Sequence, residues 1–440
     1  MPKIVFLILS MLLFLVGCTD ETISKLEPNA QKGITILIQE PINPIIESYK
    51  YKFENSKGVK VKFDIIDADT LDDYIKKLNI KLYLKNGPTL IYLPQYFFYQ
   101  SYIDSGVTLE VTDRITNLEK IYDSLKEEKV YYVPIGMYYV AKILNKSTLD
   151  ELDVKEPSLD WTKDDYLKIK EKWLSKKPRY FTFKDYDEII KEPLYNLKII
   201  GENNKISINN LKIKEFIKNT REKIFSGKYI LKDYSYENYY KIFIEGINTP
   251  EYRRVLRFLQ LVDKEILVRN LGINAFETKR VSEMIDKGDV IILPEVINEN
   301  NNFFTWGFIV NRNGKNTNLG IEFINGLLSD EVQLSMYGNG KLFGGFYPVN
   351  KKIESEIDKI DEICNYNKKA VELKKFILEK IKKSKIRPYN YDDRIHHQEL
   401  YDMLHRDLFK FIFADKPYTD EELSRELQKL EYKYNMWLNE

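Results

Sequence analysis

The chain has 440 residues and a formal net charge of +1, from 68 Lys and Arg against 67 Asp and Glu. A chain of this length is too long for one hydrophobic core, so two lobes or domains are predicted. The charge balance excludes a general electrostatic attraction to nucleic acid, and no nucleic-acid partner is expected. The aromatic content of 13%, mostly Tyr and Phe, suits a protein that stacks on a ligand and equally a protein with a Tyr-rich core.

The N-terminus has the pattern of an exported lipoprotein. Lys3 precedes an apolar run over residues 4–16 that is broken once, by a serine. This run is shorter than the about 20 residues that span a bilayer, and it fits a secretory signal segment. It ends in L-V-G-C at residues 15–18, which resembles the bacterial lipobox, where the chain is cut before the Cys and the thiol is acylated. An uncleaved membrane anchor with an incidental Cys is the alternative.

We therefore predict a signal peptide over residues 1–18 and a lipid anchor on Cys18 that holds the protein on the outer face of the cell membrane. Residues 19–32 are polar and aperiodic, and we interpret them as a tether of at most about 50 Å. Once Cys18 is acylated, only Cys364 remains, so no intrachain disulfide is possible. Cys364 is more typical of a small buried hydrophobe than of a nucleophile.

The first part of the chain alternates strand and helix patterns. Strands are predicted at residues 34–39, 59–66 and 88–93, with a helix between each pair. This order predicts βαβ units and a largely parallel sheet. Residues 94–102 follow the third strand, where ligands bind in open α/β sheets, and they contain five aromatic residues. Core packing explains that aromatic cluster equally well.

Residues 129–146 are apolar and aromatic nearly throughout, with Pro134 and Gly136 in the middle. Residues 130–133 and 138–144 both have the composition of strands. Because a Pro cannot donate a ladder hydrogen bond, the chain is predicted to bend or to change sheets here. One bent core strand is the alternative. Gly136 allows a backbone or a ligand to approach closely.

The second half of the chain continues with short strands and charged helices. A helix is predicted to begin near Asp160 or Thr162, which are good N-caps. Further strands are predicted at residues 180–183, 289–293 and 303–310, and further helices at residues 213–225, 250–266, 281–285 and 318–328. From Lys351 onward the pattern is helical and heavily charged. The three histidines lie there without a second ligand at metal spacing, so no metal site is expected.

The sequence lacks the common motifs of catalytic sites. The sequence contains no phosphate-cradling glycine loop, no G-x-S-x-G and no H-E-x-x-H. Its carboxylates form no pair whose spacing indicates acid–base chemistry. We therefore expect a protein that is not an enzyme and that has no cofactor.

Taken in order, these segments resemble the extracellular solute-binding proteins (family 1) of ABC importers, which include sugar-binding lipoproteins. The resemblance extends over nearly the whole chain. It rests on V-Y-Y-V-P through I-L-N-K at residues 130–146, P…D-W-T…D at 157–165, a glycine before a buried strand at 288, the helix pair at 323–336, G-F-Y-P-V at 345–349 and the W-L-N-E ending at 437–440. Two positions depart from the family pattern. Thr89 stands where Asp is common, and Leu144 stands where Tyr is common.

The resemblance implies an α/β, two-lobed periplasmic-binding-protein-like fold (type II), with crossing strands that join the lobes and a ligand cleft between them. One lobe would comprise residues 33–137 and 294–330, and the other residues 138–293 and 331–440. Ligand would close the lobes by a hinge motion, and the closed form would dock on an ABC importer permease. We expect a monomer.

We predict ligand contacts from residues at strand ends that would face the cleft. They are Glu40, Gln95, Tyr96, Tyr138, Asp185, Tyr186, Trp306 and Phe346. Sugars present C–H faces that stack on aromatic rings and hydroxyls that pair with polar side chains, so a carbohydrate is the expected ligand. Core packing stays an alternative for each residue singly. A sensor or adhesin of the same fold, and a secreted hydrolase, are the other functional hypotheses.

Overall fold

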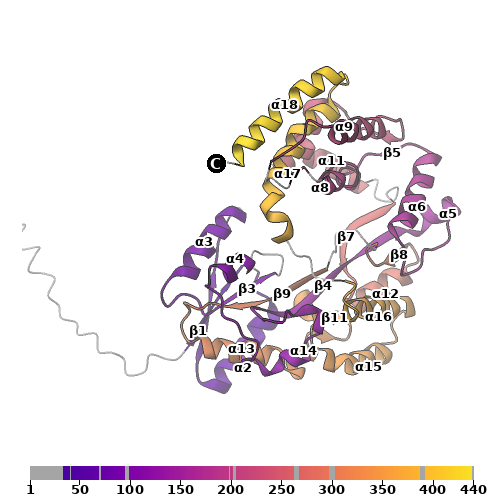
Figure 1. The fold of residues 1–440 in the computed structure, drawn as a ribbon. Helices are drawn as coiled ribbons and strands as arrows, with labels where there is room; N and C mark the ends of the chain where they lie inside the picture. The colour runs from indigo at the N-terminus through magenta and orange to yellow at the C-terminus, as the bar shows by residue number, and fades with distance from the viewer. Residues whose placement is uncertain are drawn as a thin grey trace, which may run out of the picture.

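A computed structural model describes most of the chain beyond the predicted tether. The described residues are 33–39, 41–68, 71–94, 99–197, 199–201, 205–261, 267–296, 303–386 and 392–438. Cys18 and the lipobox lie outside them. Figure 1 shows a part built on a curled β-sheet, with a second, mostly helical part above it. Within the described residues, no helix combines the length and the apolar character needed to cross a membrane.

The N-terminal strands form parallel βαβ units, as predicted. β1 (Gly33–Ile38) pairs in parallel with β2 (Lys60–Ile65) and with β3 (Leu90–Pro94). The helices between them are α2 (Pro44–Lys57) and α3 (Leu71–Tyr83). α2 begins where the Asn43 side chain accepts a hydrogen bond from the Ile45 N–H, and it ends at Gly58, whose φ of 61° is left-handed. Gly takes this conformation without the steric strain of a Cβ, which is why the helix stops there.

The rest of the sheet is antiparallel, so the prediction of a largely parallel sheet is right only for its first three strands. The strand order is β12 (Tyr347–Pro348), β4 (Tyr132–Asn145), β9 (Phe303–Val310), β3, β1 and β2. β7 (Val268–Asn274) and β8 (Val290–Leu293) also pair with β4. β8 runs antiparallel to the last residues of β4, and β9 runs antiparallel to its first residues. β8 and β9 therefore both run in the direction opposite to that of β4.

β4 (Tyr132–Asn145) is one strand of 14 residues, so the single bent strand is the correct alternative. Its pairing with β9 shifts register between Pro134 and Gly136, which is a β-bulge at the predicted bend. Gly307 lies opposite Pro134, and a Cβ on Gly307 would lie 2.1 Å from the carbonyl oxygen of Val133. Only a glycine allows the two strands to approach this closely.

β7 (Val268–Asn274) was not predicted from the sequence. It pairs with the second half of β4. Its sequence, V-R-N-L-G-I-N, contains two Asn and one Gly, which are uncommon in strands. Pairing with a long neighbouring strand decides its conformation in place of local propensity.

The helical part comprises α6 to α11 together with the last two helices. Its elements are α6 (Lys163–Lys176), α7 (Phe183–Tyr186), α8 (Glu192–Asn196), α9 (Leu211–Ile224), α10 (Tyr236–Tyr240), α11 (Pro250–Leu261), α17 (Asp392–Phe413), α18 (Asp420–Trp437) and the two-stranded ribbon β5 (Arg179–Tyr180) and β6 (Tyr229–Ile230). α6 begins at Thr162, one of the two predicted N-caps, where Thr162 and Asp165 form a capping box. The strand predicted at 180–183 is shorter, because Phe183 already opens α7.

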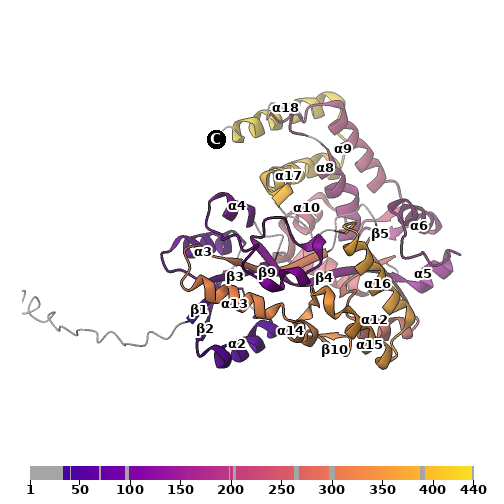
Figure 2. The same ribbon diagram turned by 60° about the horizontal axis from the view of Figure 1, so that its bottom comes forward.

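The remaining elements lie around the sheet (Figure 2). They are α4 (Tyr99–Asp104), α5 (Lys146–Glu151), α12 (Thr278–Asp286), α13 (Thr317–Leu327), α14 (Asp330–Ser335), α15 (Glu354–Cys364), α16 (Lys368–Lys382) and the two-stranded ribbon β10 (Tyr337–Gly338) and β11 (Lys341–Leu342).

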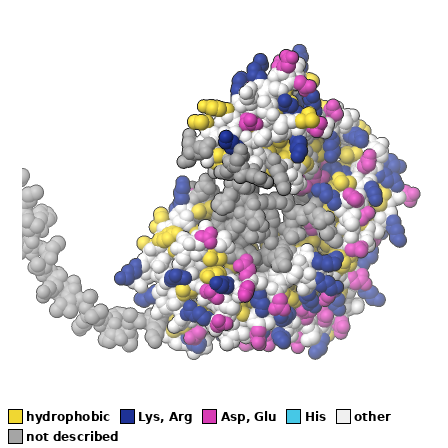
Figure 3. Space-filling view, in the orientation of Figure 1, with side chains coloured by type: hydrophobic (Ala, Val, Ile, Leu, Met, Phe, Trp, Pro, Cys, Tyr) yellow, Lys and Arg dark blue, Asp and Glu magenta, His cyan; other side chains and the backbone are white. Residues whose placement is uncertain are grey.

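The last four helices are divided between two hydrophobic cores. α15 and α16 share a core with the strands of the sheet, whereas α17 and α18 share one with α7 to α11. The lobe boundaries given above stay a prediction. On the face shown in Figure 3, basic and acidic side chains are interspersed over the described surface.

Candidate functional site

Four half-buried aromatic side chains gather where β4, β9 and the turn before β12 meet. We call Tyr138, Phe304, Trp306 and Phe346 the aromatic patch. Tyr138 lies opposite Phe304, and Trp306 lies opposite Gly136, in the pairing of β4 with β9. The Phe346 ring centroid is 6.2 Å from that of Tyr138 and 5.8 Å from that of Trp306. Side chains directly opposite each other in a sheet share a face, so the strands present these rings together.

Gly136 provides the space in which Phe346 sits. A Cβ on Gly136 would lie 2.7 Å from the Cβ of Phe346 and 3.2 Å from the methyl carbon of Met336. A close approach therefore occurs at Gly136, but the approaching group is the Phe346 side chain and not the backbone or ligand that was predicted. No side chain larger than hydrogen fits at Gly136 unless Phe346 moves.

The turn that carries Phe346 is held by two amide side chains. Gly344 and Gly345 have φ of 79° and 78°, the left-handed region that favours glycine. The Asn43 side chain donates to the carbonyl of Gly344 (3.3 Å), and the Asn274 side chain donates to that of Gly345 (2.9 Å). These hydrogen bonds tie the turn to the start of α2 and to the end of β7.

Gln333 anchors the other side of the same turn. Its buried amide nitrogen donates to the carbonyls of Ile135 and Leu327, each at 3.0 Å, and its oxygen accepts from the Val349 N–H at 2.8 Å. The side chain thus joins β4, α13 and the residue after β12. Because these donors and acceptors are satisfied, burying the amide carries no desolvation penalty.

Tyr92 of β3 backs the patch from the core. It is buried, and its ring centroid lies 5.3 Å from that of Trp306. Its hydroxyl accepts a hydrogen bond from Asn43 (3.3 Å), and burial raises the pKa of Tyr92, so the phenol stays neutral. Trp306 is therefore supported by a fixed, apolar neighbour.

Charged groups lie beside Tyr138. Burial raises the pKa of Tyr138, while the nearby Arg280 lowers it and Glu277 raises it. Arg280 and Glu277 are 3.6 Å apart at the start of α12. Further along β4, Lys142 pairs with the buried Glu295 at 2.9 Å. The patch thus offers flat apolar faces next to groups that can donate and accept hydrogen bonds.

Three of the eight predicted ligand residues meet in the patch: Tyr138, Trp306 and Phe346. Three others lie outside the described residues: Glu40, Gln95 and Tyr96. Sequence analysis missed Phe304, although its alternation with Trp306 in a predicted strand places both on one face. Whether any of them contacts a ligand stays a prediction.

Asp185 and Tyr186 are not placed with the patch, because both are buried in the helical part. The Asp185 carboxylate accepts from the Thr182 hydroxyl (2.6 Å) in a capping box and pairs with Lys170 (2.7 Å). The Tyr186 ring stacks on Phe243 with centroids 4.2 Å apart, and its hydroxyl hydrogen-bonds His405. Both side chains hold helices together in this structure.

The two departures from the family pattern also lie in the core. Thr89 is fully buried, accepts from the Thr35 N–H (3.1 Å) and donates to the Lys315 carbonyl (2.6 Å). Leu144 is fully buried against neighbours that include Trp161 and Ile291. Neither side chain is available to a ligand in this structure.

Solved structures resemble this chain along nearly its whole length. The solute receptor AcbH, whose structure is described with an exclusive preference for β-D-galactopyranose, is 15% identical over 93% of this chain and 99% of its own, with a TM-score of 0.55. An ABC substrate-binding protein from Listeria monocytogenes in complex with cycloalternan is 16% identical over 93% and 99%, with a TM-score of 0.54. A solute-binding protein from Thermotoga lettingae bound to α-D-tagatose is 12% identical over 92% and 99%, with a TM-score of 0.52.

The chain has their fold. The predicted two-lobed, periplasmic-binding-protein-like α/β architecture is thereby confirmed, as is the resemblance to ABC sugar-binding proteins. These neighbours are binding proteins rather than enzymes. No family model and no curated protein matches the sequence.

Proposed function

We propose that this chain is a solute-binding protein that captures a carbohydrate and delivers it to the permease of an ABC importer. The aromatic patch carries the proposal, because Tyr138, Phe304, Trp306 and Phe346 are half-buried side chains in a fold shared with sugar-binding proteins. The crossing strand β4 contributes Tyr138, and its Gly136 lies opposite Trp306 and against Phe346.

The chemistry of the patch suits a sugar. The C–H face of a pyranose stacks on an aromatic ring, and the neighbouring Glu277 and Arg280 can accept from and donate to its hydroxyls. Gly136 and Tyr92 fix the positions of Phe346 and Trp306, so little side-chain entropy is lost on binding. When a wrong ligand leaves a buried polar group of the site without a hydrogen-bond partner, the site binds that ligand much more weakly.

The cellular setting is part of the same proposal. The lipobox-like residues 15–18 support a lipid anchor on Cys18, with residues 19–32 as the tether. In cells supplied with a labelled fatty acid, the wild type is expected to carry the label and the Cys18→Ala variant to carry none. A wild-type protein without label, or equal labelling of the variant, would contradict the anchor without touching the proposed ligand.

The proposed ligand is tested by calorimetric titration of residues 19–440 with mono- and oligosaccharides. We expect saturable binding of at least one sugar class and a loss of at least about tenfold in affinity for Trp306→Leu, since a central ring carries a large share of a binding energy. Phe343→Ala is the matched control, because Phe343 is an exposed aromatic three residues before Phe346 and outside the patch.

One result would overturn the carbohydrate assignment, and another would overturn its placement on the aromatic patch. One is the absence of binding by every sugar class in the titration. The other is sugar binding with the same affinity in the wild type and in Trp306→Leu, which would place the sugar elsewhere.

A further inference from the structure

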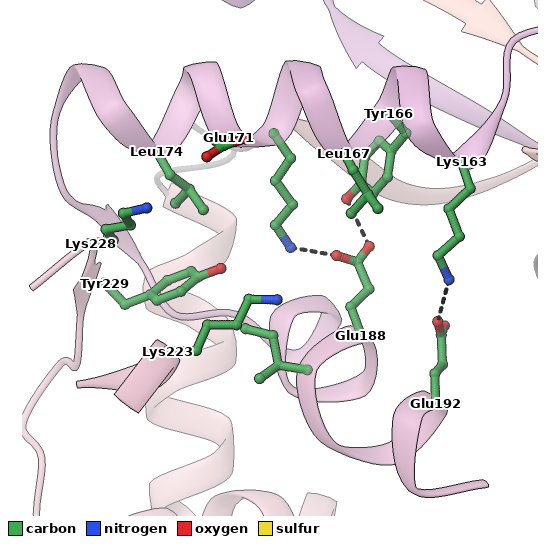
Figure 4. A pocket seen from close by; sticks show the side chains of 12 residues that line it. Lys163, Tyr166, Leu167, Glu171, Leu174, Glu188, Glu192, Lys223, Lys228 and Tyr229 are labelled. Atoms are coloured by element: carbon green, nitrogen blue, oxygen red, sulfur yellow. Dashed lines mark hydrogen bonds and ion pairs between the residues drawn. The ribbon is translucent and has the colours of Figure 1, made fainter. Parts of the chain in front are cut away.

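A second candidate site lies in the helical part, as a cavity of about 300 Å³ between α6, the helical segment Asp187–Lys191, α9 and β6 (Figure 4). We call it the α6 pocket. Its lining residues are Lys163, Tyr166, Leu167, Lys170, Glu171, Leu174, Glu188, Ile189, Glu192, Lys223, Lys228 and Tyr229. None of them comes from β4, β9 or the turn of the aromatic patch. The volume is at the lower end of the range for small-molecule sites and suits a single-ring ligand.

The carboxylates of the α6 pocket are mostly engaged. Glu188 accepts from the Tyr166 hydroxyl (2.7 Å), pairs with Lys184 (2.7 Å) and pairs with Lys170. Glu192 lies 3.9 Å from Lys163. The remaining lining carboxylate, Glu171, is exposed to solvent. The pocket therefore has little acceptor capacity left for a cation.

Two lysines, by contrast, have no counter-ion. Among the described residues, neither Lys223 nor Lys228 has an ion-pair partner. Both lysines are exposed to solvent. Loss of water and the charges of Lys170 and Lys228 lower the pKa of Lys223, whereas Glu188 and Asp185 raise it. An anion between Lys223 and Lys228 would be attracted by both amino groups.

The hydroxyl of Tyr229 adds a buried donor. Tyr229 is 6% exposed, and its hydroxyl makes no hydrogen bond of ordinary length and angle within the described chain, although the Asp185 carboxylate lies near enough to interact with it. Figure 4 shows this hydroxyl and the amino group of Lys223 pointing toward the same part of the cavity. Burial raises the pKa of Tyr229, Lys170 opposes that rise, and the carboxylates of Asp185 and Glu188 add to it, so the phenol keeps its proton. An acidic ligand in the cavity would supply this donor with an acceptor for a full hydrogen bond.

We propose that the α6 pocket binds a small organic anion. Its carboxylate or phosphate lies between Lys223, Lys228 and the Tyr229 hydroxyl, and its apolar body lies against Leu167 and Leu174. The proposal depends neither on the aromatic patch nor on the nature of the transported solute.

The test is calorimetric titration of residues 19–440 with benzoate and phenyl phosphate, and with benzyl alcohol as the neutral probe. We expect saturable binding of an anionic probe and none of the alcohol. Lys223→Gln and Tyr229→Phe are each expected to weaken that binding at least about tenfold, since each removes one hydrogen bond to a charged group. Lys212→Gln is the matched control, because Lys212 is an exposed lysine of α9 outside the pocket.

Each remaining outcome would overturn the proposal. These are failure of both anionic probes to bind, equal binding of the alcohol, and anion binding that is unchanged in Lys223→Gln and Tyr229→Phe. If inorganic phosphate bound as tightly as phenyl phosphate, the apolar part of the ligand would contribute nothing to binding, and the proposed ligand class would be wrong. Trp306→Leu should leave anion binding intact, so failure here and failure of the carbohydrate proposal can be told apart.

Discussion

Replacing Lys374 by Met is expected to lower the free energy of unfolding by about 3–5 kcal/mol. Lys374 lies in α16 and is fully buried. Its amino group is 2.5 Å from the Asp361 carboxylate and 3.2 Å from that of Asp358. Asp361 is also buried, and it accepts a hydrogen bond from the Tyr337 hydroxyl. The substitution therefore leaves a buried carboxylate without its counter-charge.

The neighbouring lysine provides the matched control. Lys375 is 52% exposed and pairs with Asp358 at 3.3 Å. An exposed pair of this kind contributes about 0–1 kcal/mol, so Lys375→Met is expected to change stability very little. The double variant Lys374→Met with Asp361→Asn should recover part of the loss, because it removes the unpaired charge.

Urea unfolding followed by circular dichroism measures all four proteins, with the midpoint and slope compared. A Lys374→Met variant within about 1 kcal/mol of the wild type would refute the reasoning. A double variant no more stable than Lys374→Met would show that packing, and not the unpaired charge, causes the loss.

Three further predictions use other features of the structure. Gly307→Ala should destabilise by at least about 3 kcal/mol in the same urea assay, since its Cβ would meet the β4 backbone, whereas Gly272→Ala, with nothing within 4 Å, should be tolerated. Burial raises the pKa of Glu188, but Lys170 and Lys184 lower it by more, so that it falls to about 2. The stabilisation that the Glu188 carboxylate contributes is therefore present above its unfolded pKa near 4.5 and is lost as the pH falls toward 2. Urea midpoints should thus fall less between pH 5 and pH 3 in Glu188→Gln than in the wild type. Gly136→Ala should weaken sugar binding in calorimetry about as much as Phe346→Ala, because the new Cβ would displace the Phe346 ring. Unchanged affinity would show that the Phe346 ring does not contact the sugar.

Features set by neighbouring residues were predictable from the sequence. The helix predicted after the first strand ends at Gly58, and α6 begins at Thr162, one of the two predicted N-caps, because each signal acts within one helical turn. The buried strand β9 was predicted with its bounds, since its apolar and aromatic composition is strong.

Features set by distant partners were not predictable in the same way. β7 has a weak strand sequence and forms because its backbone pairs with that of β4. Asp185 and Tyr186 follow a predicted strand and so resembled ligand residues. In the structure, Lys170 of α6 pairs with Asp185, and His405 of α17 hydrogen-bonds Tyr186, so both are held in the helical core. Sequence position alone does not distinguish a strand end that faces a ligand from one that faces a helix.

The aromatic patch shows how much depends on one residue of register. Before the bulge, Val133 lies opposite Phe308, and that register carried onward would place Tyr138 opposite Phe303. Phe303 is fully buried, and its side chain points to the other face of the sheet from that of Phe304. The extra residue between Pro134 and Gly136 places Tyr138 opposite Phe304 instead. The bulge at Pro134 therefore does more than bend the strand, because it decides which aromatic side chains β4 and β9 present together.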